Sequence, residues 1–229
     1  MTGRPLSVSE TRAATLLGHK FTQPLLLAEA LTHRSAAGAG GSGSNERLEF
    51  IGDRVLGLLI AEWLIERFPH EREGALGPRL ALLVSRTTLA SIAEHIGLPA
   101  LLVVAPGEAR RGVRNRATVL ADALEAMIGA LYLDAGLDPC RAFIRRAFSP
   151  MMTGQLNPPK DPKTALQEWA LARALPLPVY SQDSQSGPPH DPVFVMRVTV
   201  HDASATGTAS AKRAAEQEAA AALLGILDK

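Results

Sequence analysis

The chain has 229 residues, which is too long for one minimal domain and sufficient for two. Its 24 lysine and arginine residues nearly balance 23 aspartate and glutamate residues, so the net charge of +1 indicates neither a general binder of polyanions nor an acidic protein. The hydrophobic fraction of 46%, with 4% aromatic residues, excludes a largely disordered chain and favours a mainly helical globular protein.

Cysteine content and hydropathy predict a cytoplasmic protein that does not bind a membrane. The single cysteine, Cys140, cannot form an internal disulfide, and the N-terminal segment lacks the apolar core of a signal peptide. The longest apolar run, VLGLLIAEWLI, is interrupted by Glu62 and is far shorter than the roughly 20 residues that a membrane span needs. We therefore expect no transmembrane segment.

The N-terminal two thirds of the chain is predicted to be all-α. From residue 8 to about residue 148, apolar residues return at every third or fourth position. Segments rich in glycine or proline interrupt this pattern at residues 38–44, 69–78 and 97–115. We expect one helical domain, at residues 1–153.

The composition then changes, which predicts a linker and a second domain. The linker is expected at residues 154–160, within a stretch of prolines, a glycine and small polar residues that has little to bury. The domain at residues 161–229 is predicted to be α+β with the order α-β-β-β-α. Its predicted elements are a helix at 164–174, strands near 177–184, 193–200 and 203–210, and a helix at 211–224.

Three acidic residues share one face of the helix that begins in the sequence NERLEFIGD. At about 100° per residue, Glu46, Glu49 and Asp53 fall within a narrow arc. The opposite arc carries the apolar residues that we expect to face the core, Leu48, Ile51, Val55, Leu58 and Leu59.

A second helix, in ADALEAMIGALYLD, repeats this arrangement. Asp122 and Glu125 are three residues apart, and large apolar residues occupy the other side. In both helices a glycine follows the last acid by four residues, Gly57 after Asp53 and Gly129 after Glu125. Small residues on the acidic faces would let the helices approach closely and would bring the two pairs of acids together.

Four carboxylates in one cleft repel one another unless a cation lies between them. Ligands that are all oxygen favour Mg²⁺, with Mn²⁺ as a substitute, over zinc or copper. A site of this kind binds phosphate oxygens and activates water for in-line attack on a phosphodiester. The pattern therefore predicts a metal centre for phosphodiester hydrolysis.

The acidic faces are also compatible with a solvated surface or with a redox centre. Acidic residues on an amphipathic helix usually face solvent, often with lysine or arginine at the i+4 position. In the first helix those positions hold Phe50, Asp53 and Gly57, so the basic partners are missing. A carboxylate di-iron redox protein is disfavoured because no histidine follows any of the acids at the i+3 position.

The sequences NERLEFIGDRVL and LADALEAMIGALYLD resemble the paired signature of bacterial ribonuclease III, and LTHRS at residues 31–35 fits the same family. The segments DPKTALQEWA, GPPHDPVF and GTASAKRAAEQEAA resemble a double-stranded-RNA-binding domain. The resemblance implies a homodimer, formed through the N-terminal domain, that cuts double-stranded RNA with Mg²⁺ and without an organic cofactor. It also implies 5′-phosphate ends, short 3′ overhangs and a role in rRNA and mRNA processing.

The resemblance further assigns roles to single residues. The metal-binding acids of the family match Glu49, Asp53, Asp122 and Glu125. Asp53 and Glu125 match catalytic positions, Glu46 matches a supporting acid, and Glu73 matches an acid that helps to shape the cleavage valley of the dimer. The sequence departs from the family at residues 75–80, ALGPRL, where an arginine-leucine pair stands in inverted order beside the expected dimer interface.

The RNA-binding residues are likewise implied by the resemblance. They are Thr164, Gln167 and Glu168 in the first helix, His190 in the GPPHDP loop, and Ser210, Lys212 and Arg213 at the start of the last helix. Residues 158–229 carry seven lysines and arginines against eight acidic residues, a net charge of −1, so we predict weak RNA binding by the isolated domain.

Four arginines, Arg110, Arg111, Arg114 and Arg116, precede the second acidic helix. Their position suggests phosphate contacts, although a solvated loop explains them equally well. A non-catalytic RNA-binding protein that keeps this fold is the remaining rival function. Such a protein would not need intact acids, so their presence argues against it.

Overall fold

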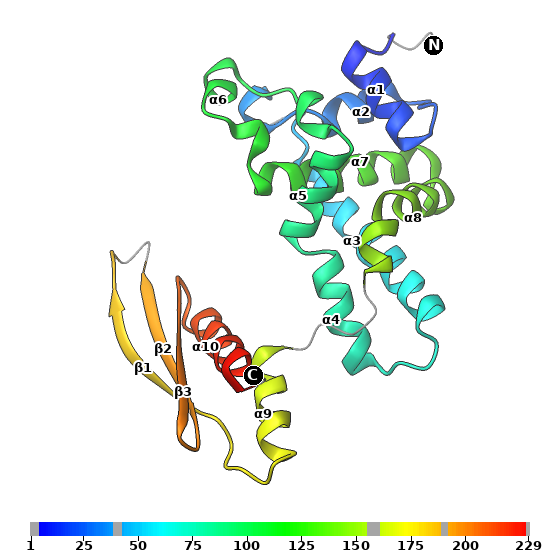
Figure 1. The fold of residues 1–229 in the computed structure, drawn as a ribbon. Coiled ribbons are helices and arrows are strands. Elements are labelled where there is room, and N and C mark those ends of the chain that lie inside the picture. The colour runs from blue at the N-terminus through cyan, green and yellow to red at the C-terminus, as the bar shows by residue number, and fades with distance from the viewer. Residues whose placement is uncertain (1–4, 39–42, 155–160, 189–191, 228–229) are drawn as a thin grey trace. The chain divides into compact units, whose positions relative to one another are not determined.

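The computed structural model describes residues 5–38, 43–154, 161–188 and 192–227. The chain divides into two compact units, residues 1–159 and 160–229. The first unit is helical and the second combines a sheet with helices (Figure 1), which confirms the predicted fold class. The predicted limits at residues 153 and 161 stay predictions, and residues 155–160 of the predicted linker lie outside the described residues.

The N-terminal unit is built from α-helices of very different lengths. Its α-helices are α1 Val8–Leu17, α2 Pro24–Ala30, α3 Glu46–Arg67, α4 Glu73–Leu83, α5 Arg86–His95, α6 Pro106–Arg110, α7 Ala117–Ala135 and α8 Leu137–Thr153. The described residues of this unit also include the 3₁₀ turns η1 Arg34–Ala36, η3 Leu98–Ala100 and η4 Val113–Asn115.

Helix α7 is the central element of this unit. It contacts α2, α3, α5 and α8, and most of its residues between Val119 and Leu131 are buried. A helix that is surrounded on every side must be apolar around its circumference, which explains its sequence. Asp122 and Glu125 are the charged residues within that buried stretch, and both are half-buried.

Helices α3 and α7 touch through their backbones at two glycines. A β-carbon on Gly129 would lie 2.1 Å from the carbonyl oxygen of Leu48, and one on Gly52 would lie 1.8 Å from that of Glu125. The predicted close approach is therefore confirmed at Gly129. The prediction for Gly57 is wrong, because a β-carbon there would meet no atom within 4 Å, and Gly52 takes its place.

Two further expectations for this unit are corrected. Leu58 does not face the core, since it is 56% exposed. The segment 69–78 is not a continuous break, since α4 already begins at Glu73 and includes Pro78. A proline removes one helix hydrogen bond and its ring crowds the carbonyl four residues earlier, but α4 packs against α3 and continues through Pro78.

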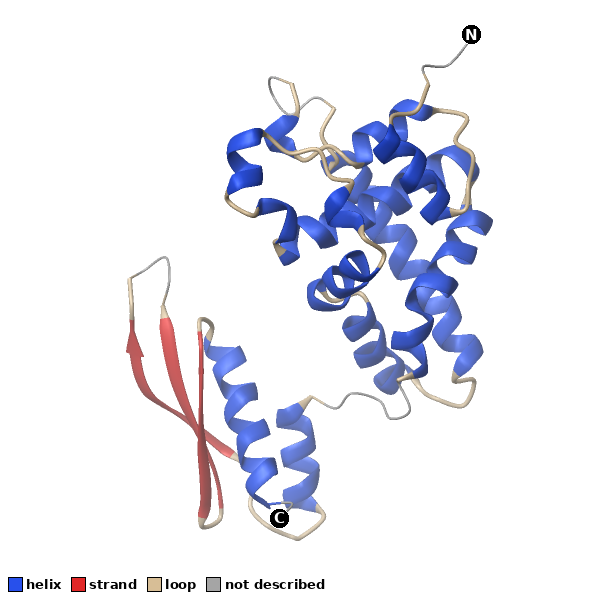
Figure 2. Cartoon of the chain, turned by 45° about the horizontal axis from the view of Figure 1, so that its top comes forward, coloured by secondary structure: helices blue, strands red, loops and turns tan. Residues whose placement is uncertain are grey.

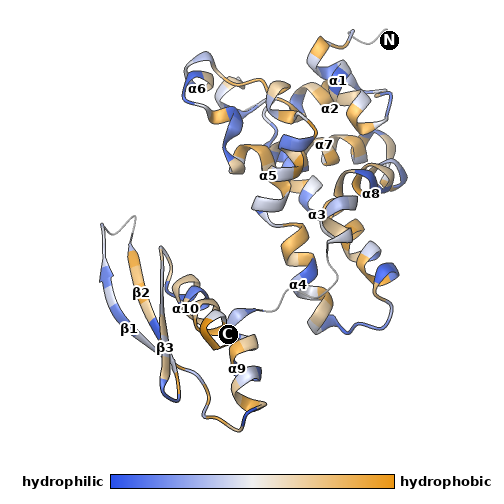
Figure 3. Ribbon diagram, in the orientation of Figure 1, coloured by the Kyte–Doolittle hydropathy of each residue, from blue (hydrophilic) through white to orange (hydrophobic). Residues whose placement is uncertain are grey.

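The C-terminal unit packs two helices on one face of an antiparallel sheet, as Figure 2 shows. Its elements are α9 Pro162–Leu171, β1 Val179–Ser186, β2 Val193–Val200, β3 Ala203–Ala209 and α10 Lys212–Leu227, with the strand order β1-β2-β3. Leu166, Val198 and Leu223 are buried between sheet and helices. The β1 strand is mostly hydrophilic (Figure 3) and exposed.

Two further observations concern Cys140 and the lengths of the helices. Cys140 is fully buried, and burial raises the pKa of its thiol to about 12, so it serves as a packing residue. Within the described ranges, every helix is too short or too polar to cross a membrane.

Candidate metal centre

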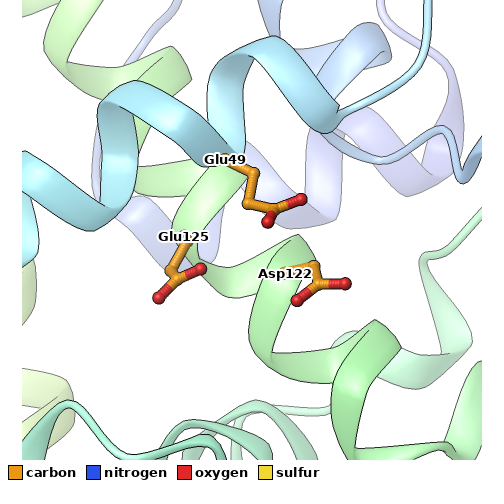
Figure 4. A group of neighbouring side chains, drawn as sticks. All are labelled: Glu49, Asp122 and Glu125. Atoms are coloured by element: carbon orange, nitrogen blue, oxygen red, sulfur yellow. The ribbon is translucent and has the colours of Figure 1, made fainter.

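Three carboxylates converge between α3 and α7. Glu49 extends from α3, and Asp122 and Glu125 extend from α7 (Figure 4). Each offers one oxygen, and these oxygens all lie within 4.8 Å of one another. Three of the four acids predicted to bind metal are thus brought together, although they come from helices far apart in the sequence.

The local structure explains this convergence. Asp122 and Glu125 are three residues apart and therefore project from the same side of α7. Glu49 lies in the first turn of α3, and its backbone N–H donates to the carbonyl of Asn45. The contact at Gly52 keeps the helix axes close enough for these side chains to meet.

The pKa values of the three carboxyl groups are raised by burial, and for Glu49 and Glu125 also by their proximity to other acids. Burial, followed by the charges of Glu49 and Asp122, raises the pKa of Glu125 to about 7. Burial also raises the pKa of Glu49, with a contribution from Asp122, and raises the pKa of Asp122. Nearby arginines, including Arg86, oppose the pKa shifts of the two α7 acids only in part.

The donor set fits a divalent cation. Carboxylate oxygens are the ligands that Mg²⁺ and Mn²⁺ prefer, and a cation among them would remove the repulsion that raises their pKa values. A solvated acidic face does not describe these three residues, because all are half-buried and their charges crowd one another. The centre could therefore hold such an ion.

Asp53 lies outside this group of three. It is placed one helical turn beyond Glu49 on α3, and its carboxylate pairs with the guanidinium of Arg54. The guanidinium carbon of Arg54 also lies 5.0 Å from the centroid of the Phe50 ring. The role of Asp53 in metal binding stays a prediction.

A cleft of about 800 Å³ adjoins the three carboxylates and shares Glu49 and Asp122 with them. Glu46 lines it, and the Glu46 carboxylate accepts a hydrogen bond of 2.9 Å from the Ser44 hydroxyl. Basic and polar side chains also line this cleft, namely His33, Arg34, Ser35 and Arg116. The cleft therefore offers both signs of charge beside the centre.

Sequence reasoning found these cleft residues only in part. The sequence assigned no role to residues 33–35, which line the cleft. Their place in the LTHRS motif was the signal that could have identified them. Of the four arginines expected to contact phosphate, Arg116 lines the cleft, whereas Arg111 pairs with Glu108 at 3.2 Å. Glu73 is exposed in the first turn of α4, outside the group of three acids.

The predicted RNA-binding residues gather in part at a second site. A pocket of about 770 Å³ lies where the N-terminal ends of α9 and α10 meet. Four predicted residues line it, Thr164, Gln167, Lys212 and Arg213. Glu168 and Ser210 do not line this pocket, and both are exposed. His190 lies outside the described residues.

Lys163 also lines this pocket, although the sequence did not predict it. Its ammonium group lies 2.6 Å from a carboxylate oxygen of Glu216 and 4.3 Å from the centroid of the Tyr180 ring. Asp161 caps α9 and accepts a hydrogen bond of 2.7 Å from Gln217. Lys163 is therefore engaged within the domain, whereas Lys212 and Arg213 are exposed.

Family models match both parts of the chain. A model described as Ribonuclease-III-like matches residues 23–152, and a model described as double-stranded RNA binding motif matches residues 162–227. The first match contains all the acids of the candidate metal centre. The second match contains α9 and α10, and with them every residue that lines the second pocket except Asp161.

Curated relatives are similar over nearly the whole chain. Ribonuclease 3 from Dinoroseobacter shibae is 47% identical over 93% of each chain. Ribonuclease 3 from Mesorhizobium japonicum is 48% identical over 90% of this chain and 94% of the relative.

Solved structures agree with these sequence matches. A crystal structure of the nuclease domain of ribonuclease III from Campylobacter jejuni is 34% identical, with a TM-score of 0.58, and covers 64% of this chain and 97% of that chain. A second structure of that domain, described as flexible in a region involved in dimer formation, is 35% identical with a TM-score of 0.57. It covers 61% of this chain and 95% of that chain. With its matching domains and its relatives of nearly equal length, the chain belongs to the ribonuclease III family.

Proposed function

We propose that the protein is an endoribonuclease that cleaves double-stranded RNA with Mg²⁺, for which Mn²⁺ can substitute. The observation that carries this proposal is the group of three carboxylates from Glu49, Asp122 and Glu125, whose oxygens lie within 4.8 Å of one another. Membership of the ribonuclease III family supports the substrate class. A non-catalytic RNA-binding role would leave these costly half-buried acids without a purpose.

We propose different roles for the acids of the N-terminal unit. Glu49, Asp122 and Glu125 would hold the cation, which supplies positive charge at the phosphodiester and a water of lowered pKa. Asp53, one turn beyond Glu49, is proposed as the fourth metal-binding acid and, with Glu125, as a catalytic residue. Hydrolysis would leave a 5′-phosphate and a 3′-hydroxyl. Glu46 and Glu73 are proposed to support the site.

A homodimer through the N-terminal unit is part of the proposal. Large apolar side chains are exposed on α3 and α4, namely Phe50, Leu58, Ile65 and Leu82. Exposed apolar residues along neighbouring helices are typical of an interface. The Campylobacter jejuni nuclease domain, described as having a region involved in dimer formation, supports the same interpretation. Two sites in one dimer would cut both strands and leave short 3′ overhangs.

The C-terminal domain is proposed to hold the duplex. Lys212 and Arg213 would contact phosphates at the start of α10, while Thr164, Gln167 and Glu168 on α9 would face a minor groove. Ser210 and His190 are proposed as further contacts. We expect duplex segments of ribosomal and messenger RNA precursors to be the substrates.

A cleavage assay tests this proposal directly. A long RNA duplex is incubated with the wild-type protein and Mg²⁺, with the protein and EDTA, and with Glu125→Gln and Mg²⁺. Cleavage is expected only in the first reaction, and a single-stranded RNA of the same sequence should stay intact. If the wild type binds the duplex without cutting it, the RNA-binding alternative is correct. Equal cleavage by Glu125→Gln would instead refute the assigned site.

A further inference from the structure

The largest fully buried side chain among the described residues is an arginine. Arg79, on α4, has 0% exposure in a unit whose core is otherwise built mainly from apolar residues. Burial of a guanidinium removes its hydration, so the protein must compensate with hydrogen bonds and opposite charge. The identity of those partners shows what the arginine holds in place.

Arg79 contacts residues that precede its own helix. Its Nε donates to one carboxylate oxygen of Glu71 at 2.8 Å and its Nη2 donates to the other at 2.7 Å. The guanidinium carbon lies 3.8 Å from the centroid of the Phe68 ring. We call this arrangement of Phe68, Glu71 and Arg79 the α4 clamp. The ion pair lowers the pKa of the Glu71 carboxyl, chiefly through the hydrogen bonds from Arg79.

The α4 clamp bridges a weak point in the backbone. Phe68 ends α3, Glu71 lies in the turn, and Arg79 follows Pro78 inside α4. Because Pro78 has no N–H, the helix loses the hydrogen bond that would tie its second half to the carbonyl of Gly74. The first turn of α4 is therefore held less firmly by hydrogen bonds within the helix. The α4 clamp compensates, because it ties Glu71, which precedes this turn, to Arg79, which follows it.

Stability alone does not require an arginine at position 79. Replacing a buried ion pair with packed apolar side chains is often neutral or stabilising, so such a pair is better explained by the single geometry that it selects. A bidentate guanidinium stacked on a ring is a directional contact that leucine cannot reproduce. Glu73 lies between Glu71 and Arg79 in the chain, and its side chain is exposed in the first turn of α4.

We propose that Arg79 is a positioning residue for cleavage, because the α4 clamp fixes the first turn of α4 and with it the orientation of the Glu73 side chain. This inference rests on the proposed function, in which Glu73 is a supporting acid. Arg79 itself is fully buried. It would act through the turn at residues 69–73, which its guanidinium contacts at Glu71.

A double-mutant cycle tests the inference in the full-length protein. Cleavage of an RNA duplex is measured for wild type, Arg79→Met, Glu73→Gln and the double variant. Arg79→Met should lower kcat by on the order of tenfold with little change in KM, since a small misplacement of a catalytic-site group can cost up to about a hundredfold. In the Glu73→Gln background the same change should lower kcat by less than about twofold, because the two residues act as one unit.

Controls separate positioning from general loss of structure. Arg67→Met removes another arginine near the Phe68 ring, at 5.9 Å, and should leave kcat unchanged. Amide hydrogen exchange should become faster at residues 71–77 in Arg79→Met and stay unchanged in α7. If Arg79→Met does not fold, Glu71→Gln weakens the same ion pair while retaining one acceptor, and it should show the same coupling to Glu73 with a smaller effect.

The outcomes are distinct. Additive effects of Arg79→Met and Glu73→Gln, or full activity of Glu73→Gln, overturn the inference and leave the proposed function intact. A wild-type protein that does not cleave the duplex refutes the proposed function and removes the inference with it. Coupling between the two substitutions, together with faster exchange confined to residues 71–77, supports it.

Discussion

A β-carbon on Gly52 would lie 1.8 Å from the backbone carbonyl oxygen of Glu125. The helix that carries Glu49 thus rests directly on the backbone of another acid of the candidate metal centre. The two backbones meet at this point, which leaves little room for a side chain to absorb a displacement. The spacing of the carboxylates is therefore set by backbone contact, with Gly129 and Leu48 making a similar contact one turn away.

Replacing Gly52 with alanine should disrupt this contact. The added β-carbon must displace a helix backbone rather than a flexible side chain, so we expect a loss of about 3 kcal/mol or more in the free energy of unfolding, at the upper end of overpacking effects. Gly57→Ala is the matched control, because its β-carbon meets no atom within 4 Å. It should stabilise α3 by about 0.5–1 kcal/mol through helix propensity. Urea unfolding of both variants measures the difference, and equal stabilities would contradict the proposed contact.

Metal affinity should depend steeply on pH around neutrality. The pKa of Glu125 is raised to about 7, chiefly by burial and then by Glu49 and Asp122. A cation binds the deprotonated carboxylate, so Mn²⁺ affinity should fall by up to about tenfold per pH unit as the pH decreases below about 7. Calorimetry in buffers of different ionisation enthalpy should detect close to one proton released by Glu125 per ion at about pH 6. An affinity that is constant from slightly acidic to slightly alkaline pH would contradict the pKa shift.

The stability of the metal-free protein should change in the opposite direction. Because the pKa of Glu125 is raised from 4.5 to about 7, the folded state binds a proton more tightly than the unfolded state does. This contribution is fully present below about pH 4.5 and is lost as the pH rises through about 7, by up to about 3 kcal/mol. Glu125→Gln lacks the titrating group. In EDTA, its stability relative to wild type should therefore increase from about pH 4.5 to about pH 8, and a constant difference would exclude the effect.

The helix wheel explains why sequence reasoning selected the three acids that lie together in the structure. It placed Glu49, Asp122 and Glu125 on acidic faces, and the structure brings these three together. It could not identify the line along which the helices touch. That line runs through Gly52, which lies roughly 60° around α3 from Glu49 but roughly 100° from Asp53. Glu49 consequently reaches the α7 acids, while Asp53 pairs with its neighbour Arg54.

Sequence reasoning also failed to predict which apolar residues are exposed and which charged residues are buried. Leu58 follows the period of a core residue but is 56% exposed, because hydrophobic periodicity does not distinguish a face that packs in the core from one that is exposed. Arginine is usually a surface residue, but Arg79 is fully buried. The sequence could not predict this burial, because the partner Glu71 lies in the turn before the helix and no helical period connects the two residues. Both depend on tertiary packing that local patterns do not encode.

The basic residues of the C-terminal domain should separate into two classes. Lys212→Gln and Arg213→Gln should each weaken duplex RNA binding and reduce the slope of log affinity against log salt by about 1, since each exposed side chain would lose one phosphate contact. The control for this prediction is Lys163→Met, which should leave that slope unchanged, because the Lys163 ammonium group pairs with Glu216 at 2.6 Å. Lys163→Met should instead lower the melting temperature of the domain. Filter binding at several salt concentrations, with catalysis blocked by Glu125→Gln, measures the slopes. A loss of slope in Lys163→Met equal to that in Lys212→Gln would show that the Glu216 ion pair opens on RNA.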